Sequence, residues 1–213
     1  MIRKNKNEKN LGFYIKRIFD IIISLISLIV LFPIFIISGI LIKLDSDGPI
    51  FFRQERVGKS GKIFKIYKFR TMVLNAEKIG LGYSVKKDDP RITKIGKFLR
   101  LTGIDELPQI INVLKGEMSL VGPRPTLLYQ VKKYSDWEKR RLEMKPGVTS
   151  LMIISGHNKL SWPEKIKTDI YYIEHWSLWL DLKILFKTFW VIIFTREGIY
   201  EDNPKIDLPE KNE

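Results

Sequence analysis

Cysteine is absent from this chain of 213 residues, and histidine occurs only twice, at His157 and His175. The lack of cysteine excludes disulfides, thiolate metal sites and a cysteine nucleophile. Two imidazoles are too few for a histidine-rich metal site, and we expect each to be a surface or hydrogen-bonded polar residue rather than a catalytic base. The chemistry of the chain is therefore sought among its carboxylates and its basic residues.

Acidic residues are also in short supply: 24 Asp and Glu stand against 37 Lys and Arg, a formal net charge of +13. Such an excess of positive charge indicates a polyanionic partner. Nucleic acid, an anionic lipid surface and a phosphorylated small molecule all meet that description, and charge alone does not choose among them. The hydrophobic fraction of 45% excludes a disordered protein and suits one domain of ordinary size plus an anchor.

Charge is missing altogether from residues 21–42, and these 22 positions meet the roughly 20 residues that a helix needs to cross a bilayer. A cleaved signal peptide is a weak alternative, because the run is long for its apolar part and no small-x-small cleavage pattern follows closely. Pro33 stands near the midpoint, with Arg17 before the run and Lys43 after it. We therefore expect a re-entrant helix, broken at Pro33, with both ends on one membrane face. A straight span stays open, since membrane helices tolerate proline.

Beyond the apolar run, the pattern predicts two short strands, 50–53 and 63–69, joined by a turn at 58–61. Three basic residues in the second strand alternate with apolar ones: Lys65, Lys68 and Arg70. They form either a solvated strand face or a basic wall that faces a diphosphate.

Amphipathic helices are expected over 92–101 and 126–145, and residues 75–90 are expected to end in a polar loop that acts as a lid. The last third mixes aromatic and basic residues, which suits interfacial helices, although a plain aromatic core explains the same pattern.

The stretch 100–125 carries an adjacent acid pair, Asp105 and Glu106. Apolar residues at i, i+3, i+4 and i+7 after the pair predict a short helix that begins at or just before Asp105, with Pro108 in its first turn. One interpretation is that Asp105 caps this helix and Glu106 complements its dipole. The other interpretation is a site for a metal-assisted reaction on a phosphate, formed with the arginines on either side, Arg100 and Arg124. The carboxylates would bind a divalent cation or act as the nucleophile, and the guanidiniums would bind phosphate oxygens.

Several motifs resemble the bacterial sugar transferase family, the monotopic phosphoglycosyl transferases. They are KRIFD at 16–20, FKIYKFRTM at 64–72, DELPQIINVLKGEMSLVGPRP at 105–125, KPGVT at 145–149 and DIYYIE at 169–174. The resemblance covers residues 16–190 in the family's order. It is closest to the minimal form of the family, without the additional membrane helices of larger members.

The resemblance implies transfer of a sugar phosphate from a UDP-sugar to a polyprenol phosphate, such as undecaprenyl phosphate, with release of UMP. Asp105 would be the nucleophile that forms an aspartyl-phosphosugar, and Glu106 would bind Mg²⁺. Arg100, Arg124 and, with less support, Lys68 would hold phosphate groups. The expected partners are these two substrates and the membrane, with no nucleic acid, and a homodimer is compatible with the sequence.

The fold expected from pattern and resemblance is α/β and membrane-associated, on the cytoplasmic face of the bacterial inner membrane. We divide the chain into a basic leader at 1–15, a re-entrant anchor at 16–45, a compact catalytic domain at 46–196 with short strands and interfacial helices, and a disordered polar tail at 197–213. Two departures from the family pattern stand out: Phe32 precedes Pro33 where the family has serine, and the segment 150–158 is altered.

Two hypotheses from other classes compete with an enzyme. A membrane-tethered binder of polyanions would use the basic surface without catalysis, and its binding would fall steeply with salt. A single-span structural subunit would place the ends of the apolar run on opposite membrane faces. Neither hypothesis explains the dense block of acids and arginines at 100–125. The sugar, the polyprenol length and the glycan pathway are not readable from the sequence.

Overall fold

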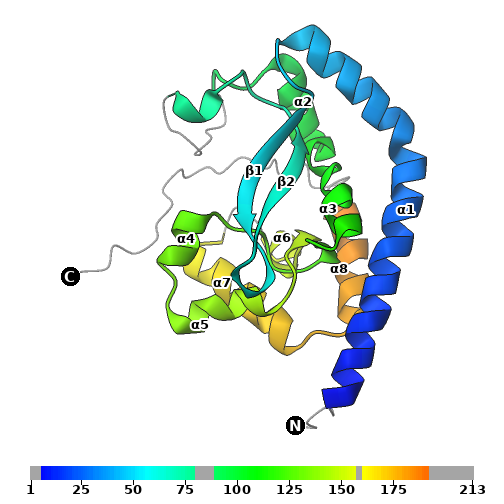
Figure 1. Cartoon of the computed structure of the whole chain (residues 1–213), viewed down its shortest axis with the longest axis vertical. Coiled ribbons are helices and arrows are strands. Elements are labelled where there is room, and N and C mark those ends of the chain that lie inside the picture. The colour runs from blue at the N-terminus through cyan, green and yellow to red at the C-terminus, as the bar shows by residue number, and fades with distance from the viewer. Residues whose placement is uncertain (1–5, 80–88, 157–159, 192–213) are drawn as a thin grey trace, which may run out of the picture.

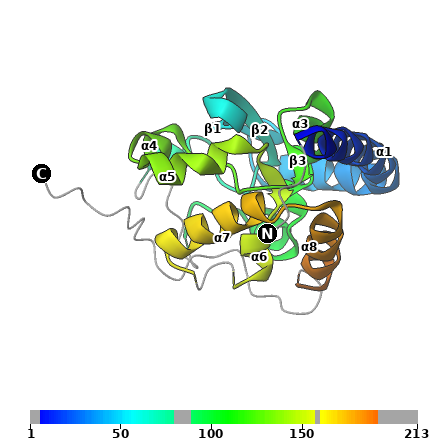
Figure 2. The ribbon, with the colours of Figure 1, turned by 90° about the horizontal axis from the view of Figure 1, so that it is seen from below.

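The computed structural model describes residues 6–79, 89–156 and 160–191. The structure is mixed α/β, as expected, and its helices and strands follow in this order: α1 (Lys6–Asp45), β1 (Phe51–Val57), η1 (Lys59–Gly61), β2 (Ile63–Phe69), η2 (Ala76–Lys78), α2 (Lys94–Thr102), η3 (Ile104–Glu106), α3 (Gln109–Lys115), β3 (Ser119–Val121), α4 (Leu128–Lys132), α5 (Asp136–Lys139), η4 (Arg140–Glu143), β4 (Gly147–Thr149), α6 (Leu151–Ile154), α7 (Trp162–Glu174) and α8 (Leu178–Trp190). Figures 1 and 2 show α1 along one side of the domain, next to α3 and α8, with α4 and α5 on the opposite side.

The long helix α1 is continuous, with Pro33 inside it, and it curves around the domain (Figure 1). The break that we expected at Pro33 is therefore wrong: the helix continues through the proline, which membrane helices tolerate. The helix already begins at Lys6, so residues 6–15 of the expected leader are helical. The polar tail at 197–213 and the centre of the expected lid at 80–88 lie outside the described residues.

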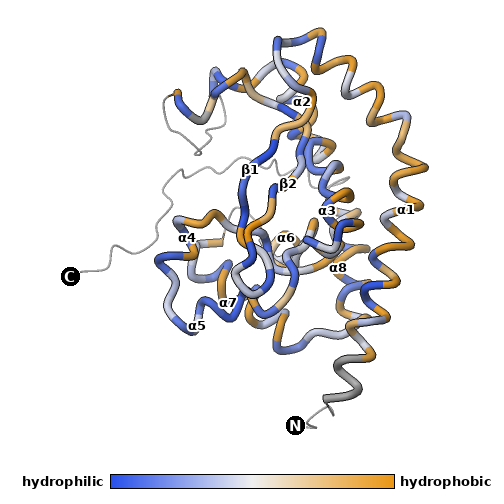
Figure 3. Tube along the Cα trace, viewed as in Figure 1, coloured by the Kyte–Doolittle hydropathy of each residue, from blue (hydrophilic) through white to orange (hydrophobic). Residues whose placement is uncertain are grey.

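The side of α1 that packs on the domain is its polar side. Four polar residues of the helix are buried, Lys16, Asp20, Ser24 and Ser38, with Ile42 continuing their row. Large apolar side chains point outward instead, among them Ile29 at 76% and Leu44 at 79% exposure. Figure 3 shows this helix coloured as hydrophobic along most of its length. Residues 11–45 are long and apolar enough to cross a membrane, and little of this segment is buried in the domain.

Polar contacts fix the first half of α1. The Lys16 ammonium lies 2.6 Å from Asp181 Oδ2 of α8. The Arg17 guanidinium donates to the carbonyl oxygens of Val113 (2.6 Å) and Leu114 (2.9 Å) near the end of α3. Because an isolated charge is costly to bury, these contacts specify which side of the helix faces the domain.

The far end of α1 is held by the same domain. Phe35 and Ile42 pack against Phe69 of β2 in a second, smaller core. The Arg70 guanidinium donates to the carbonyl oxygens of Ser46 and Asp47, each at 2.6 Å, just past the last turn of α1. The segments before and after Pro33 therefore contact one and the same domain.

The predicted hairpin is confirmed, with a longer first strand. β1 and β2 pair antiparallel from Phe51 opposite Phe69 to Val57 opposite Ile63. Phe64 and Ile66 enter the main core together with Val113 of α3, whereas Phe69 enters the second core. β2 thus contributes to both cores and is held on both of its faces.

The single helix expected over 126–145 is wrong, because the segment forms three short elements, α4, α5 and η4. The Ser135 hydroxyl accepts from the Glu138 backbone N–H, and the Glu138 carboxylate accepts from the Ser135 N–H, which begins a new helix inside the expected one. The parallel pairing of β3 with β4 was not expected from either three-residue segment.

Candidate active site

The acid pair lies in a separate turn between two helices, not in the first turn of the helix that follows. α2 ends at Thr102, and Gly103 takes the left-handed conformation, with φ of 70°, that closes it. Asp105 and Glu106 then form the 3₁₀ turn η3, and Pro108 is the N-cap of α3 rather than a first-turn residue. The helix boundary expected at Asp105 is therefore wrong, because the glycine starts a new turn that the apolar spacing does not reveal.

Asp105 is buried, with 5% of its surface exposed, and its Oδ1 atom has no hydrogen-bond partner. Burial raises the pKa of this carboxyl to about 6, and the neighbouring negative charge of Glu106 adds to the rise. The positive charges of Lys68, Arg100 and Arg124 oppose it. At neutral pH the carboxylate is therefore mostly ionised, with an oxygen available to a ligand.

Glu106 lies between two of the expected phosphate-binding residues. Its Oε1 atom accepts from Lys68 Nζ at 2.6 Å and from Arg124 Nη2 at 3.4 Å. The structure thus places Lys68 of β2, the acid pair of η3 and the loop after β3 in one site, although Lys68 and Arg124 are 56 positions apart in the sequence.

Arg100 lies in the last turn of α2, and its Nε atom donates to Thr71 Oγ1 at 2.8 Å. The charge of Arg100 acts on Asp105 and lowers the pKa of that carboxyl. Thr71 therefore orients a guanidinium toward the acid pair, a role that sequence analysis missed. Thr71 belongs to the FRTM segment at 69–72, but no sequence spacing indicates that it contacts Arg100.

Of the three basic residues in and directly after β2, only Lys68 reaches the acid pair. Lys68 contacts Glu106, whereas Lys65 is exposed and Arg70 is turned toward the end of α1. The three residues therefore serve different purposes, and β2 does not present a continuous row of cations to the site.

Asn112 is a fully buried residue of α3 that sequence analysis also missed. Its side-chain oxygen accepts from the Tyr67 N–H at 3.0 Å, and its amide nitrogen donates to the Lys65 carbonyl at 2.8 Å. The Asn112 side chain thus bonds to two backbone groups of β2, as a neighbouring strand would. These bonds fix the position of α3 along β2. That position brings Lys68 to the acid pair.

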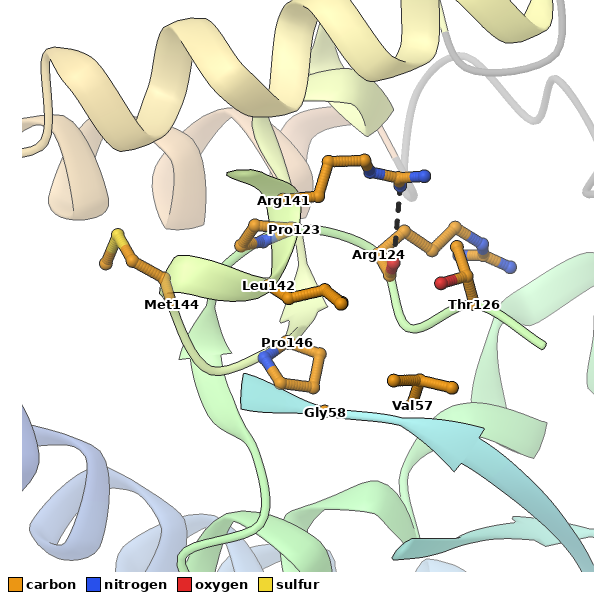
Figure 4. Close-up of a pocket in the computed structure, with 9 residues that line it drawn as sticks. All are labelled: Val57, Gly58, Pro123, Arg124, Thr126, Arg141, Leu142, Met144 and Pro146. Atoms are coloured by element: carbon orange, nitrogen blue, oxygen red, sulfur yellow. Dashed lines mark hydrogen bonds between the residues drawn. The ribbon is translucent and has the colours of Figure 1, made fainter. Parts of the chain in front are cut away.

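A small pocket lies behind the loop that carries Arg124 (Figure 4). Its lining consists of residues from β1, η4 and the loops that follow β3 and precede β4: Val57, Gly58, Pro123, Arg124, Thr126, Arg141, Leu142, Met144 and Pro146. Arg141 is buried, forms an ion pair with Asp169 of α7 and donates to the Arg124 carbonyl at 3.4 Å. Arg124 therefore sits on a loop whose main chain is supported from inside the domain.

The donor set of the site fits Mg²⁺. This ion is usually held by one or two carboxylates together with waters and substrate phosphates. Asp105 offers a buried oxygen without a partner, and Glu106 stands beside it. Within the described ranges there is no group of three or more His, Asp and Glu residues, so phosphate oxygens of a substrate would have to supply further ligands.

Comparison with known proteins shows the family of the chain. A sequence model of the family described as bacterial sugar transferase matches residues 11–195. The chain belongs to the bacterial sugar transferase family. The matched range includes most of α1, the acid pair and the loop of Arg124.

Among its relatives, the galactosyl transferase CpsE of Streptococcus agalactiae is 46% identical over 192 residues, which cover 84% of this chain and 42% of that protein. A UDP-glucose:undecaprenyl-phosphate glucose-1-phosphate transferase of Klebsiella pneumoniae is 44% identical over 183 residues, covering 81% of this chain and 39% of that protein. The uncharacterized sugar transferase EpsL of Bacillus subtilis is 41% identical over 189 residues, covering 89% and 92%. This bacterial sugar transferase thus spans less than half of the first two relatives and nearly all of the third.

Proposed function

We propose that this chain transfers a sugar 1-phosphate from a UDP-sugar to a polyprenol phosphate such as undecaprenyl phosphate, the first membrane step in assembly of a glycan. The observation that carries the proposal is Asp105: a buried carboxylate with an unpartnered oxygen, placed among Lys68, Arg100 and Arg124. The side-chain oxygen of a capping residue accepts a hydrogen bond from a backbone N–H group, whereas Asp105 Oδ1 accepts none.

In the first half-reaction, an Asp105 oxygen attacks the phosphorus that carries the sugar. A P–O bond to the uridylyl group breaks, UMP leaves, and the sugar phosphate is joined to Asp105 as an acyl phosphate. In the second half-reaction, a phosphate oxygen of the polyprenol phosphate attacks the same phosphorus. The bond to Asp105 breaks, which restores the carboxylate and yields a polyprenyl-diphosphate-sugar. Two displacements with one covalent intermediate predict ping-pong kinetics.

The basic residues stabilise the charge that moves in these steps. Lys68 and Arg124 lie against Glu106, and Arg100 is oriented by Thr71, so three cations surround the reacting phosphate. Glu106, and the free oxygen of Asp105 before attack, would hold Mg²⁺. A bound Mg²⁺ supplies neutralisation of phosphate oxygens during transfer.

The membrane placement in this proposal is monotopic, on the cytoplasmic face of the bacterial inner membrane. The outward face of α1 is apolar, which suits lipid, and contacts on both sides of Pro33 join the same domain. A helix that crossed the bilayer from one side to the other would carry one of those ends away from the domain. We therefore assign α1 as a re-entrant helix that continues through Pro33.

The aromatic helix α8 is assigned to the interface on similar grounds. Trp179, Phe186 and Trp190 are each more than half exposed, although their helix lies beside α1. Exposed aromatic side chains next to an apolar helix match the headgroup region of a bilayer.

The test is UMP release by the detergent-purified chain given Mg²⁺, undecaprenyl phosphate and a panel of UDP-sugars that includes the galactose, glucose and N-acetylhexosamine forms. We expect repeated turnover with at least one donor only when the acceptor lipid is present, and no release in EDTA. Without the acceptor, release should stop at about one UMP per protein molecule. Mass spectrometry of the protein incubated with that donor alone should reveal a phosphosugar on Asp105. Release that persists in Asp105→Asn would contradict the assigned nucleophile, and silence with every donor from folded protein would contradict the reaction.

A further inference from the structure

Three cationic side chains converge past the end of α3, away from the acid pair: Arg17 of α1, Lys59 of η1 and Lys145 before β4. Gly116 has φ of 81°, and the position that a β-carbon would occupy there lies 3.3 Å from Arg17 Nη2 and 3.5 Å from Lys145 Nζ. The two nitrogens are therefore no farther apart than the sum of these distances. Lys59 approaches from the hairpin, with its Nζ 5.8 Å from the centre of the Phe13 ring of α1.

The charge of this cationic cluster is not neutralised by ion pairs. No carboxylate of the described residues forms a salt bridge with Arg17, Lys59 or Lys145. Burial lowers the pKa of the Lys145 ammonium, and the charges of Arg17 and Lys59 lower it further, against the opposing charge of Asp20. Like charges held together in this way would be stabilised by an anion.

Asp20 does not serve as that anion at hydrogen-bond distance. Its Oδ2 atom accepts from the Ser119 hydroxyl at 2.8 Å, and its Oδ1 atom accepts from the Leu120 N–H at 3.2 Å. Asp20 is therefore committed to the start of β3 and leaves the three cations without a hydrogen-bonded carboxylate.

The cationic cluster is separate from the reaction centre. The acid pair precedes the first residue of α3, and the cluster lies past its last residue, where Arg17 donates to the Val113 and Leu114 carbonyls. A helix of this length spans about 10 Å, so one phosphate cannot contact both places. The ligand of the cluster is thus not the reacting phosphate.

The surroundings of the cluster point to a lipid headgroup. On α1, Leu11 is 62% and Tyr14 71% exposed, so the outward apolar face of the helix begins within two turns of Arg17. When α1 lies in the bilayer as proposed above, this level of the helix meets the headgroups. Amines and a guanidinium at headgroup level attract anionic phosphate.

We propose that Arg17, Lys59 and Lys145 form a binding site for the phosphate of an anionic phospholipid headgroup. The inference rests on the proposed membrane placement of α1 and not on the reaction at Asp105. A zwitterionic lipid fits the site less well, because its own cation would lie near three others. The bound lipid would fix the rotation of α1 and the hairpin tip relative to the membrane surface.

The experiment is native mass spectrometry of the full chain in detergent, titrated with phosphatidylglycerol or with phosphatidylcholine of the same acyl chains. We expect the wild type to retain phosphatidylglycerol about tenfold better, and Lys59→Gln/Lys145→Gln to lose most of this preference. The matched control, Lys132→Gln/Lys133→Gln, removes two exposed lysines around the end of α4 on the opposite side of the domain and should keep the preference. Arg17 is left unchanged because it caps α3.

Equal retention of the two lipids by the wild type would overturn the inference, as would a preference that survives in the double variant. Soluble glycerol phosphate, added as a competitor, should displace the lipid only weakly if the membrane lipid is the ligand. Displacement at equal concentrations would overturn the assignment to lipid and leave a free phosphate ester. UMP release is measured on the same preparations, and Asp105→Asn should keep the wild-type lipid preference, so failure of catalysis and failure of lipid binding are separable.

Discussion

Asp105 of the proposed reaction centre and Asp181 of the α1–α8 contact are buried to nearly the same degree, at 5% and 3% exposure. Asp181 accepts hydrogen bonds from Lys16 Nζ (2.6 Å), the Tyr172 hydroxyl (2.7 Å) and Trp176 Nε1 (3.2 Å). Asp105 has an oxygen with no partner, and burial raises its pKa. Burial alone therefore does not mark a functional carboxylate in this protein. An unpartnered oxygen alone does not either, because Asp169 Oδ1 also lacks a partner. Asp105 differs in standing next to a second acid, Glu106, which Lys68 and Arg124 contact.

The strongest test of this comparison is Asp105→Asn. If the unpartnered oxygen is the nucleophile, the substitution should lower the rate of UMP release by about 10⁴-fold or more, because the amide cannot form the acyl phosphate. The measurement is radiolabelled UMP release, with thermal unfolding in detergent as the control for folding. A variant with more than a tenth of wild-type activity would assign Asp105 to structure instead.

Asp181→Asn changes the carboxylate whose hydrogen-bond partners are all present. It leaves the buried Lys16 ammonium without a counter-ion, so we expect a loss of about 3–5 kcal/mol in the free energy of unfolding. Thermal and denaturant unfolding in detergent measure the loss. Lys16→Met/Asp181→Leu removes both charges and should recover most of the stability. If the single variant were as stable as the wild type, the contact would not hold α1.

The pH dependence of stability sharpens the comparison further. The pKa of Asp105 is raised to about 6 in the folded state from 3.8, so its stabilising contribution is present below pH 3.8 and is lost as the pH rises through about 6. At pH 8 Asp105→Asn should therefore be more stable than the wild type by about 3 kcal/mol, and at pH 4 nearly equal to it. Denaturant unfolding at the two pH values measures this. A constant difference would show that Asp105 is not perturbed.

Lys68→Met should have the smallest effect among these predictions, and the effect should be on the pKa of Asp105. The ammonium of Lys68 lowers the pKa of Asp105, so its removal should move the acidic limb of the pH–rate profile upward by about one unit. Lys65→Met, an exposed position on the same strand, is the control and should leave the limb in place. The position of the limb, not the height of the profile, decides the outcome.

Local patterns were sufficient for part of the fold and of the site. The alternation in 63–69 predicted β2, the amphipathic spacing in 92–101 predicted α2, and the acid pair was found from residue type and context. Lys16, Asp20 and Ser24 are spaced four residues apart, which places them on one side of a helix. This spacing indicates the domain-facing side of α1, although the sequence analysis did not use it.

The rest depends on contacts between distant segments. The parallel pairing of β3 with β4 joins two three-residue stretches, too short to carry a periodicity. Thr71, Asn112 and the Arg141–Asp169 pair act through partners far along the chain, which spacing within a segment cannot reveal. Which side chains of the aromatic last third are exposed and which pack on the cores likewise depends on tertiary contacts.

If α1 lies in the bilayer as proposed, the hydrogen bonds of Arg70 to the end of α1 fix the height of the proposed reaction centre above the membrane. Lys68 of β2 precedes Arg70 by two positions, a distance of about 7 Å, so the proposed site and the end of α1 cannot move apart. With α1 in the bilayer, a lipid acceptor always presents its phosphate at one elevation. The hydrocarbon tail below that level does not enter the geometry, so acceptors of different tail length should be used at similar rates.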